Sequence, residues 1–153
     1  MDIPLSLYIE PVQLGIWVVL VLVLILLSAL FSGSEVAFFS LKSEDLEELK
    51  SRKGFSSKWA VELYERPKYL LSTLLIMNNL VNVAIIVLTS HLLIKVFNNF
   101  HENPVLGFLV DVVFITSIIL LFGEIAPKVY ANRKNKELAS FMAIPLFLLS
   151  KLL

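Results

Sequence analysis

The sequence contains no cysteine and only two histidines. The absence of thiols excludes disulfides, thiolate metal sites, iron–sulfur clusters and cysteine nucleophiles. A bound metal would therefore be held by oxygen atoms, or by His91 or His101. The sequence also lacks an HExxH motif and a Ser/His/Asp arrangement near its polar clusters. We therefore predict that the protein is not an enzyme.

An excess of charge of either sign is also missing. The sequence has 13 Lys and Arg against 13 Asp and Glu, so bulk charge gives no reason to expect nucleic-acid binding. The segment from Met1 to Gln13 holds no Lys or Arg and so lacks the basic region of a secretory signal peptide. We expect the apolar run that follows it to be retained.

Apolar residues dominate what is present. Hydrophobic residues make up 58% of the sequence and its mean hydropathy is +0.83, against an apolar share of roughly 45 to 50% in soluble domains. Apolar runs at 14–31, 69–94 and 105–122 approach or exceed the length needed to cross a bilayer. We predict an all-α membrane protein of the cell membrane, with lipid as its main partner and transmembrane helices at about 14–39, 69–96 and 105–126.

Most basic residues lie in two segments, the one between the first and second predicted spans and the one after the third. The positive-inside rule then predicts an outer N-terminus and a cytoplasmic C-terminus. The basic residues concerned are Lys42, Lys50, Arg52, Lys53, Lys58, Arg66 and Lys68, followed by Lys128, Arg133, Lys134 and Lys136.

The first cytoplasmic segment, 43–66, is predicted to form a helical hairpin on the surface. Ser43 is a candidate N-cap and Gly54 a candidate end of the first helix, while the second helix would run from Ser57 to Arg66, before Pro67. A regulatory role for this hairpin is an alternative that nothing in the sequence supports.

The last segment, 137–153, is apolar but short and contains Pro145. A juxtamembrane helix that is interfacial, re-entrant or cut short fits it better than a full span. Because the chain ends inside this apolar segment, we expect the natural protein to continue beyond it. No repeat or flexible linker divides residues 1–153, which predicts a single transmembrane domain.

Each predicted span carries a polar cluster that lipid-facing helices do not need. On the first, Ser28, Ser32 and Glu35 recur at helical spacing and share one face, with Gly33 and Ser34 beside them. Packing between helices explains the serines and the glycine. It does not explain the carboxylate.

The second span carries Asn78, Asn79 and Asn82. Asn78 and Asn82 share a face, and Asn79 points about a quarter of a turn away. A single asparagine in a membrane helix is as readily interhelical glue as an ion ligand. Three within one short stretch favour ion coordination.

The third span ends with Gly123 and Glu124, followed by Pro127 and Lys128. Pro127 cannot donate a hydrogen bond and crowds the carbonyl of Gly123, which would leave that carbonyl free beside the carboxylate. The alternative is a simple kink in which Glu124 pairs with Lys128 one turn later.

With this membrane orientation, the three clusters lie at a similar depth in the bilayer, toward the cytoplasmic ends of their helices. They therefore fit one cavity open to the cytoplasm. Its groups are carboxylate, carboxamide, hydroxyl and carbonyl oxygens, which suit Mg²⁺, Ca²⁺ or Na⁺ better than zinc or copper. His91, His101 and Asp111 lie toward the outer side and are interpreted as bystanders.

The motifs Phe31 to Ala37, Asn78 to Asn82 and Gly123 to Lys128, in this order and at this spacing, resemble the transmembrane domain of the CorC and cyclin M (CNNM) magnesium transporters. The resemblance covers nearly the whole chain. It implies a homodimer that binds Mg²⁺ within the membrane and exports it, with Na⁺ as the candidate coupling ion. Carried over by motif, the expected metal-site residues are Ser32, Ser34, Glu35, Asn78, Asn79, Asn82, Gly123 and Glu124. Ser28 is added to the predicted metal site because it shares a helix face with Ser32 and Glu35.

Two further expectations come with this resemblance. Family members usually continue into a cytoplasmic pair of CBS modules that bind adenine nucleotides, and that region would follow the present chain. The leading function is Mg²⁺ transport. The alternative is a membrane anchor that senses Mg²⁺ without transporting it and acts on a partner channel or transporter.

Overall fold

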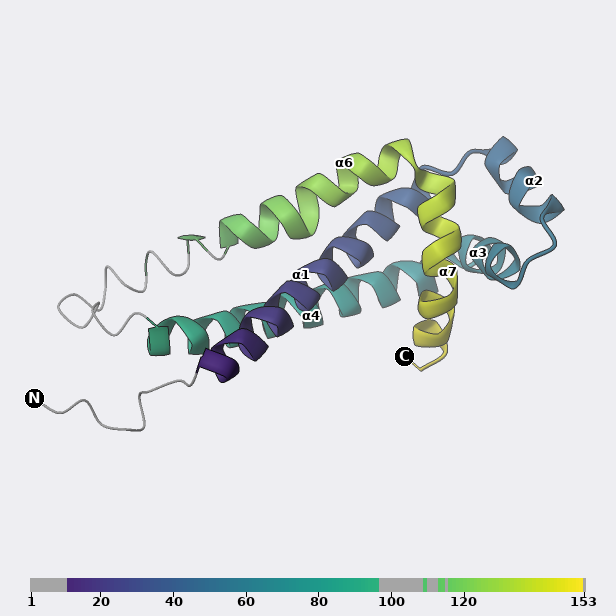
Figure 1. Ribbon diagram of the computed structural model, residues 1–153. Helices are drawn as coiled ribbons and strands as arrows, with labels where there is room; N and C mark the ends of the chain where they lie inside the picture. The colour runs from purple at the N-terminus through teal and green to yellow at the C-terminus, as the bar shows by residue number, and fades with distance from the viewer. Residues whose placement is uncertain (1–10, 97–108, 110–112, 115, 153) are drawn as a thin grey trace, which may run out of the picture.

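The computed structural model describes residues 11–96, 109, 113–114 and 116–152 (Figure 1). All secondary structure in these residues is helical, which confirms the all-α prediction for this part of the chain. The helices are α1 (Pro11–Phe39), α2 (Ser43–Ser51), α3 (Phe55–Glu65), α4 (Pro67–Val96), the π-helix η3 (Ile119–Ile125), α6 (Ala126–Arg133) and α7 (Asn135–Leu152).

Helices α1 and α4 are the two long elements, with 29 and 30 residues respectively. At about 1.5 Å per residue each exceeds the roughly 30 Å of bilayer hydrocarbon. Residues Val12–Phe39 and Pro67–Ser90 have the length and apolar composition of membrane spans. The predicted third span, 105–126, falls partly outside the described residues, so the structure supports two of the three expected spans.

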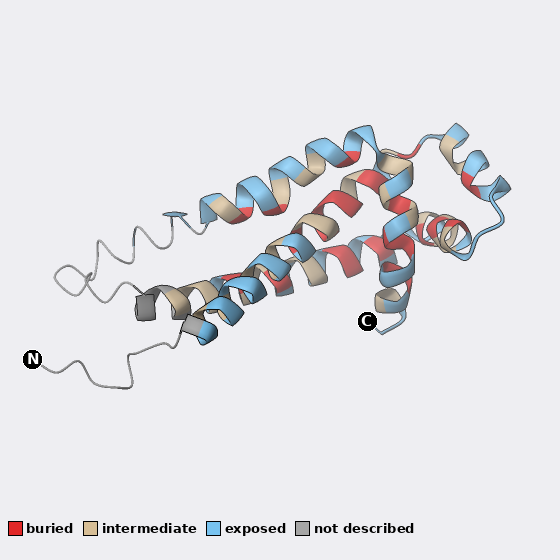
Figure 2. Cartoon of the chain, in the orientation of Figure 1, coloured by how far each residue is buried: buried red, intermediate tan, exposed pale blue. Residues whose placement is uncertain are grey.

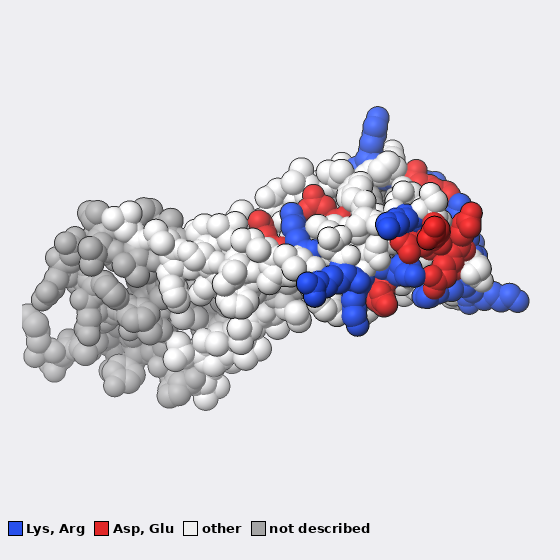
Figure 3. Space-filling model, turned by 90° about the horizontal axis from the view of Figure 1, so that it is seen from above, with Lys and Arg blue, Asp and Glu red and all other residues white. Residues whose placement is uncertain are grey.

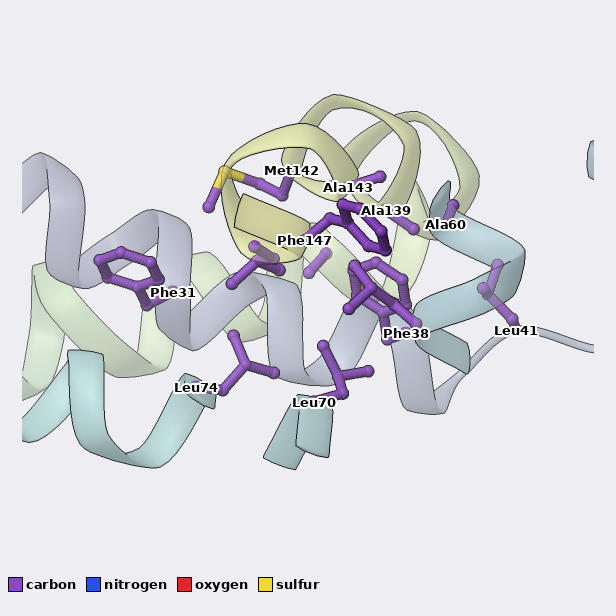
Figure 4. Close-up of a cluster of buried hydrophobic side chains, with 14 of the residues drawn as sticks. Phe31, Phe38, Leu41, Ala60, Leu70, Leu74, Ala139, Met142, Ala143 and Phe147 are labelled. Carbon is purple, nitrogen blue, oxygen red and sulfur yellow. The ribbon is translucent and has the colours of Figure 1, made fainter. Parts of the chain in front are cut away.

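Buried residues gather at one end of the molecule, where α1, α3, α4 and α7 meet (Figure 2). Phe38 and Leu70 are fully buried there, and Phe31 and Leu74 continue the core along α1 and α4 (Figure 4). Away from this end many apolar side chains of α1 and α4 are exposed in the single chain, although Val81 and Ile85 of α4 remain buried. That distribution fits helices whose outer surfaces contact lipid.

Helices α2 and α3 form at the predicted hairpin, but their boundaries differ from those expected. Ser43 is already helical and Lys42 precedes it, with the Lys42 backbone N–H donating to Asp45 Oδ2 at 2.9 Å. The prediction that Ser43 caps the helix is therefore wrong, because the Asp45 carboxylate satisfies the terminal amide. Gly54 does not end α2 either. Arg52 leaves the helix first with extended backbone, and Gly54 precedes α3.

Helix α7 lies across the ends of α1 and α4 rather than alongside them (Figure 1). One face, with Met142, Leu146 and Phe147, is buried against α1 and α3. The indole of Trp59 on α3 stacks on the Phe147 ring, with centroids 4.9 Å apart and planes 9° from parallel. Helix α7 is thus packed onto the hairpin by an apolar and aromatic contact.

Charged side chains cluster at this same end, over α2, α3 and α7 (Figure 3). Lys136 on α7 lies 2.7 Å from Glu48 and 3.5 Å from Asp45, both on α2. Hydrogen bonds from Lys136 and Arg52 hold the pKa of Glu48 below its usual range, and the Glu48 carboxylate raises the pKa of Lys136. The ion pair therefore joins α2 to α7.

Acid should weaken this connection. Because the folded state lowers the pKa of Glu48, its contribution is complete above the unfolded value, about 4.3, and is lost as pH falls through the folded pKa. Because the folded state raises the pKa of Lys136, its contribution to stability is complete below the unfolded pKa, about 10.4. That contribution is lost as pH rises through the folded pKa. We expect Glu48→Gln to lower the melting temperature near neutral pH, where the carboxylate is charged, and to have a smaller effect at strongly acidic pH, where the carboxyl group becomes protonated. An effect of the same size at neutral and at strongly acidic pH would contradict the assignment.

Loss of the aromatic contact should be more damaging. Phe147→Ala removes a side chain that is only 9% exposed, and such truncations cost about 3 to 5 kcal/mol. We expect a lower melting temperature and a change in Trp59 fluorescence. The matched control is Phe141→Ala on the same helix, because Phe141 is 67% exposed. Equal effects of the two substitutions would contradict the described packing.

Candidate functional site

The buried serines of α1 begin the site. Ser28, Ser32 and Ser34 are all buried, and Glu35 is half-buried. The Ser28 hydroxyl donates to Asn82 Oδ1 at 2.7 Å, and Asn78 Oδ1 lies 3.4 Å from the same oxygen. Since a hydroxyl has one proton, the shorter contact is the hydrogen bond. This bond joins α1 to α4.

Asn82 also reaches the third polar cluster. Its Nδ2 atom donates to Glu124 Oε1 at 3.4 Å, a long hydrogen bond. One carboxamide therefore connects a hydroxyl of α1 with a carboxylate of η3. The three clusters, which lie on separate parts of the sequence, are side by side in the structure.

Gly123 allows this close approach. A Cβ atom at this position would lie 2.9 Å from Ser28 Oγ, which is closer than real Cβ contacts come. Gly33 serves a similar purpose one turn further along α1, where a Cβ would lie 3.1 Å from Leu138 Cδ2 and 3.4 Å from the Pro127 carbonyl oxygen. The two glycines thus bring α1 against η3 and α6.

Helix η3 is followed by a proline that interrupts its backbone hydrogen bonding. The Ala126 N–H donates to the Leu121 carbonyl, five residues back, as in a π-helix. The next residue is Pro127, which has no N–H to donate. The missing donor would have served Phe122 in the π register or Gly123 in the α register. Carbonyl oxygen is therefore left without its usual helical partner next to Glu124.

Glu35 lies near Asn78. Both line a small cavity of about 50 Å³, together with apolar side chains of α1 and α4. Glu35 Oε2 lies 3.0 Å from Lys128 Nζ on α6. The alternative in which Lys128 pairs with Glu124 on its own helix is therefore wrong, because Lys128 turns to α1 while Glu124 turns to Asn82.

Two predicted site residues stand apart from this cluster. The Ser34 hydroxyl donates to the Leu30 carbonyl of its own helix at 2.6 Å, and Asn79 is exposed. Ser32, by contrast, has a buried hydroxyl oxygen with no hydrogen-bond partner in the described part of the chain. The side chains of His91, His101 and Asp111 lie outside the described residues.

This arrangement fits a hard cation. Among the described residues, no three His, Cys, Asp or Glu side chains gather at one place, so a site built from these residue types alone is not present there. Two carboxylates with hydroxyl, carboxamide and carbonyl oxygens are instead the ligand types of Mg²⁺ and Ca²⁺. The Ser32 hydroxyl, one turn along α1 from Ser28, is buried without a hydrogen-bond partner in the described residues and is a candidate for a further oxygen ligand.

Comparison with known proteins identifies the family of this chain. Residues 19–153 match the family described as the cyclin M transmembrane N-terminal domain. The chain belongs to this family. Its membership makes the apolar helices α1 and α4 those of a membrane protein.

Two curated relatives of this cyclin M domain are bacterial. A UPF0053 protein of Haemophilus influenzae is 29% identical over 132 residues, which cover 86% of this chain and 30% of the relative. The UPF0053 inner membrane protein YfjD of Escherichia coli K12 is 29% identical over 126 residues, covering 80% of this chain and 28% of the relative. The cyclin M domain thus spans less than a third of the length of either relative.

Sequence reasoning missed one residue of this cyclin M site, the Lys128 partner of Glu35. Spacing along one helix points to Glu124 as its partner, and no local signal reports a contact with α1. The pairing arises only when Gly33 lets α1 approach Pro127, next to Lys128.

Gly123→Ala tests the close approach. The added methyl group should displace Ser28 and break its hydrogen bond to Asn82, at a cost of about 1 to 3 kcal/mol. Gly15→Ala is the control, because nothing lies within 4 Å of its Cβ position and alanine favours a helix. We expect a lower melting temperature for the first variant and an unchanged or higher one for the second. The reverse order would contradict the geometry.

Proposed function

We propose that this domain binds Mg²⁺ between α1, α4 and η3 and carries it across the membrane. The observation that carries the proposal is the double contact of Asn82, to Ser28 on one side and to Glu124 on the other. This contact gathers oxygen atoms of three helices around one point. Buried polar groups of this kind within membrane helices mark ion pathways.

Charge supports a cationic cargo. Glu35 and Glu124 formally supply two negative charges, and Lys128 neutralises one of them. Mg²⁺ gives up its water only where oxygen ligands are well placed. The Ser28 hydroxyl, the carboxamides and the unpaired carbonyl of η3 are held by helix packing, so the oxygens are positioned before the ion arrives.

We further propose three spans, an outer N-terminus and a cytoplasmic C-terminus. The third span would consist of residues 105–126. The charged end formed by α2, α3 and α7 would then face the cytoplasm, as the positive-inside rule requires (Figure 3). The site lies toward this end, so it would open to the cytoplasm. A homodimer, export and coupling to Na⁺ are parts of the proposal that rest on the family resemblance.

The binding site can be tested by calorimetry on the purified protein. Asn82→Ala and Glu124→Gln should each weaken Mg²⁺ binding at least tenfold, because hydrogen bonds to charged groups contribute about 1.5 to 3 kcal/mol. Asn79→Ala is the matched control, since Asn79 is the same residue type on the same helix but is exposed. Undiminished binding in both site variants would contradict the assignment.

Flux measurements separate a transporter from a sensor. The protein is reconstituted into liposomes that contain a Mg²⁺ indicator, and a Mg²⁺ gradient is imposed. We expect a signal that depends on the protein and falls in Glu124→Gln. Binding without flux would favour the alternative function, in which the domain senses Mg²⁺ and regulates a partner.

A further inference from the structure

The ion pair between Glu35 and Lys128 lies next to the site but is not explained by oxygen coordination. The two charged atoms are 3.0 Å apart, and the side chains are 44% and 40% exposed. The pair joins α1 to α6, and Glu35 shares its small cavity with Asn78. Among the described residues, no other ion pair reaches either Glu35 or Glu124.

The ammonium group of Lys128 lies beside Glu35, where a bound metal ion would also be attracted. Glu35 can bind Lys128 or contribute its charge to a metal ion, and a metal ion at Glu35 would repel the ammonium at so short a distance. A lysine ammonium group can move away from Glu35 easily, because it is carried on a flexible chain of four carbons. An arginine would be held by a more rigid fork of donors.

We propose that Lys128 is a tethered counter-cation that neutralises Glu35 while the site is empty and is displaced when Mg²⁺ binds. The inference rests on the proposed function and adds a role for a residue outside the oxygen cluster. It explains how the empty protein avoids a bare carboxylate in a medium of low dielectric constant. It also keeps Mg²⁺ affinity low enough for release, since an ion that moves through a site must also leave it.

Removing the Lys128 charge should therefore raise the affinity for Mg²⁺ and lower the rate of Mg²⁺ flux. Lys128→Met should bind Mg²⁺ at least tenfold more tightly by calorimetry, while its maximal flux in liposomes falls because release and return of the empty site slow down. Lys128→Arg retains the charge and should stay within a few-fold of the wild-type affinity. Lys134→Met is the matched control, because Lys134 is exposed just after α6 and should change neither quantity.

A double-mutant cycle tests whether Lys128 acts through Glu35. In a Glu35→Gln background the ammonium has no carboxylate to neutralise, so Lys128→Met should no longer tighten Mg²⁺ binding. An equal gain in both backgrounds would show that Lys128 acts by general repulsion, and would overturn the competition.

Displacement can also be observed directly. Acetylation of lysines followed by mass spectrometry should show that Mg²⁺ makes Lys128 more reactive and leaves Lys134 unchanged. If wild-type protein bound no Mg²⁺, the proposed function itself would fail. If wild-type protein bound Mg²⁺ but Lys128→Met bound it no more tightly, and Lys128 did not gain reactivity, only the counter-cation role would fail.

Discussion

A polar side chain within hydrocarbon must find its partners inside the protein, because no water is available to replace them. Asn82 meets this constraint for three helices at once, since its oxygen accepts from Ser28 and its nitrogen donates to Glu124. Both polar atoms of the Asn82 side chain are thus hydrogen-bonded, and the Ser28 hydroxyl and the Glu124 carboxylate each have a partner in this amide. Asn82 therefore links α1, α4 and η3 at the site, in addition to the apolar packing between these helices.

This contact is possible only where the backbones approach closely. Gly123 accommodates Ser28, and Gly33 accommodates the chain near Pro127. Further toward the charged end, the apolar core of α1 and α4 continues into the stacked rings of Trp59 and Phe147. The apolar core that holds α7 thus includes residues of the helices that carry the polar site. A displacement of α7 would therefore change the packing of α1.

Much of the helix pattern was predictable from the sequence, because it depends on local periodicity and apolar length. The expected second helix, 69–96, differs from α4 only at its start, and the polar faces of the first and second helices follow from residue spacing. The boundary at Gly54, the π-helix η3 and the pairing of Glu35 with Lys128 were not predictable. Each depends on a contact between elements, and a pattern along one helix does not report such contacts.

The most direct test of the central claim is to locate a bound ion. Mn²⁺ is a surrogate for Mg²⁺ that prefers the same oxygen ligands, and its anomalous diffraction identifies it in a crystal. We predict a peak between α1, α4 and η3, close to Ser28, Asn82 and Glu124. A Mn²⁺-loaded crystal with no peak there, or with its only peak at the charged end formed by α2, α3 and α7, would contradict the account.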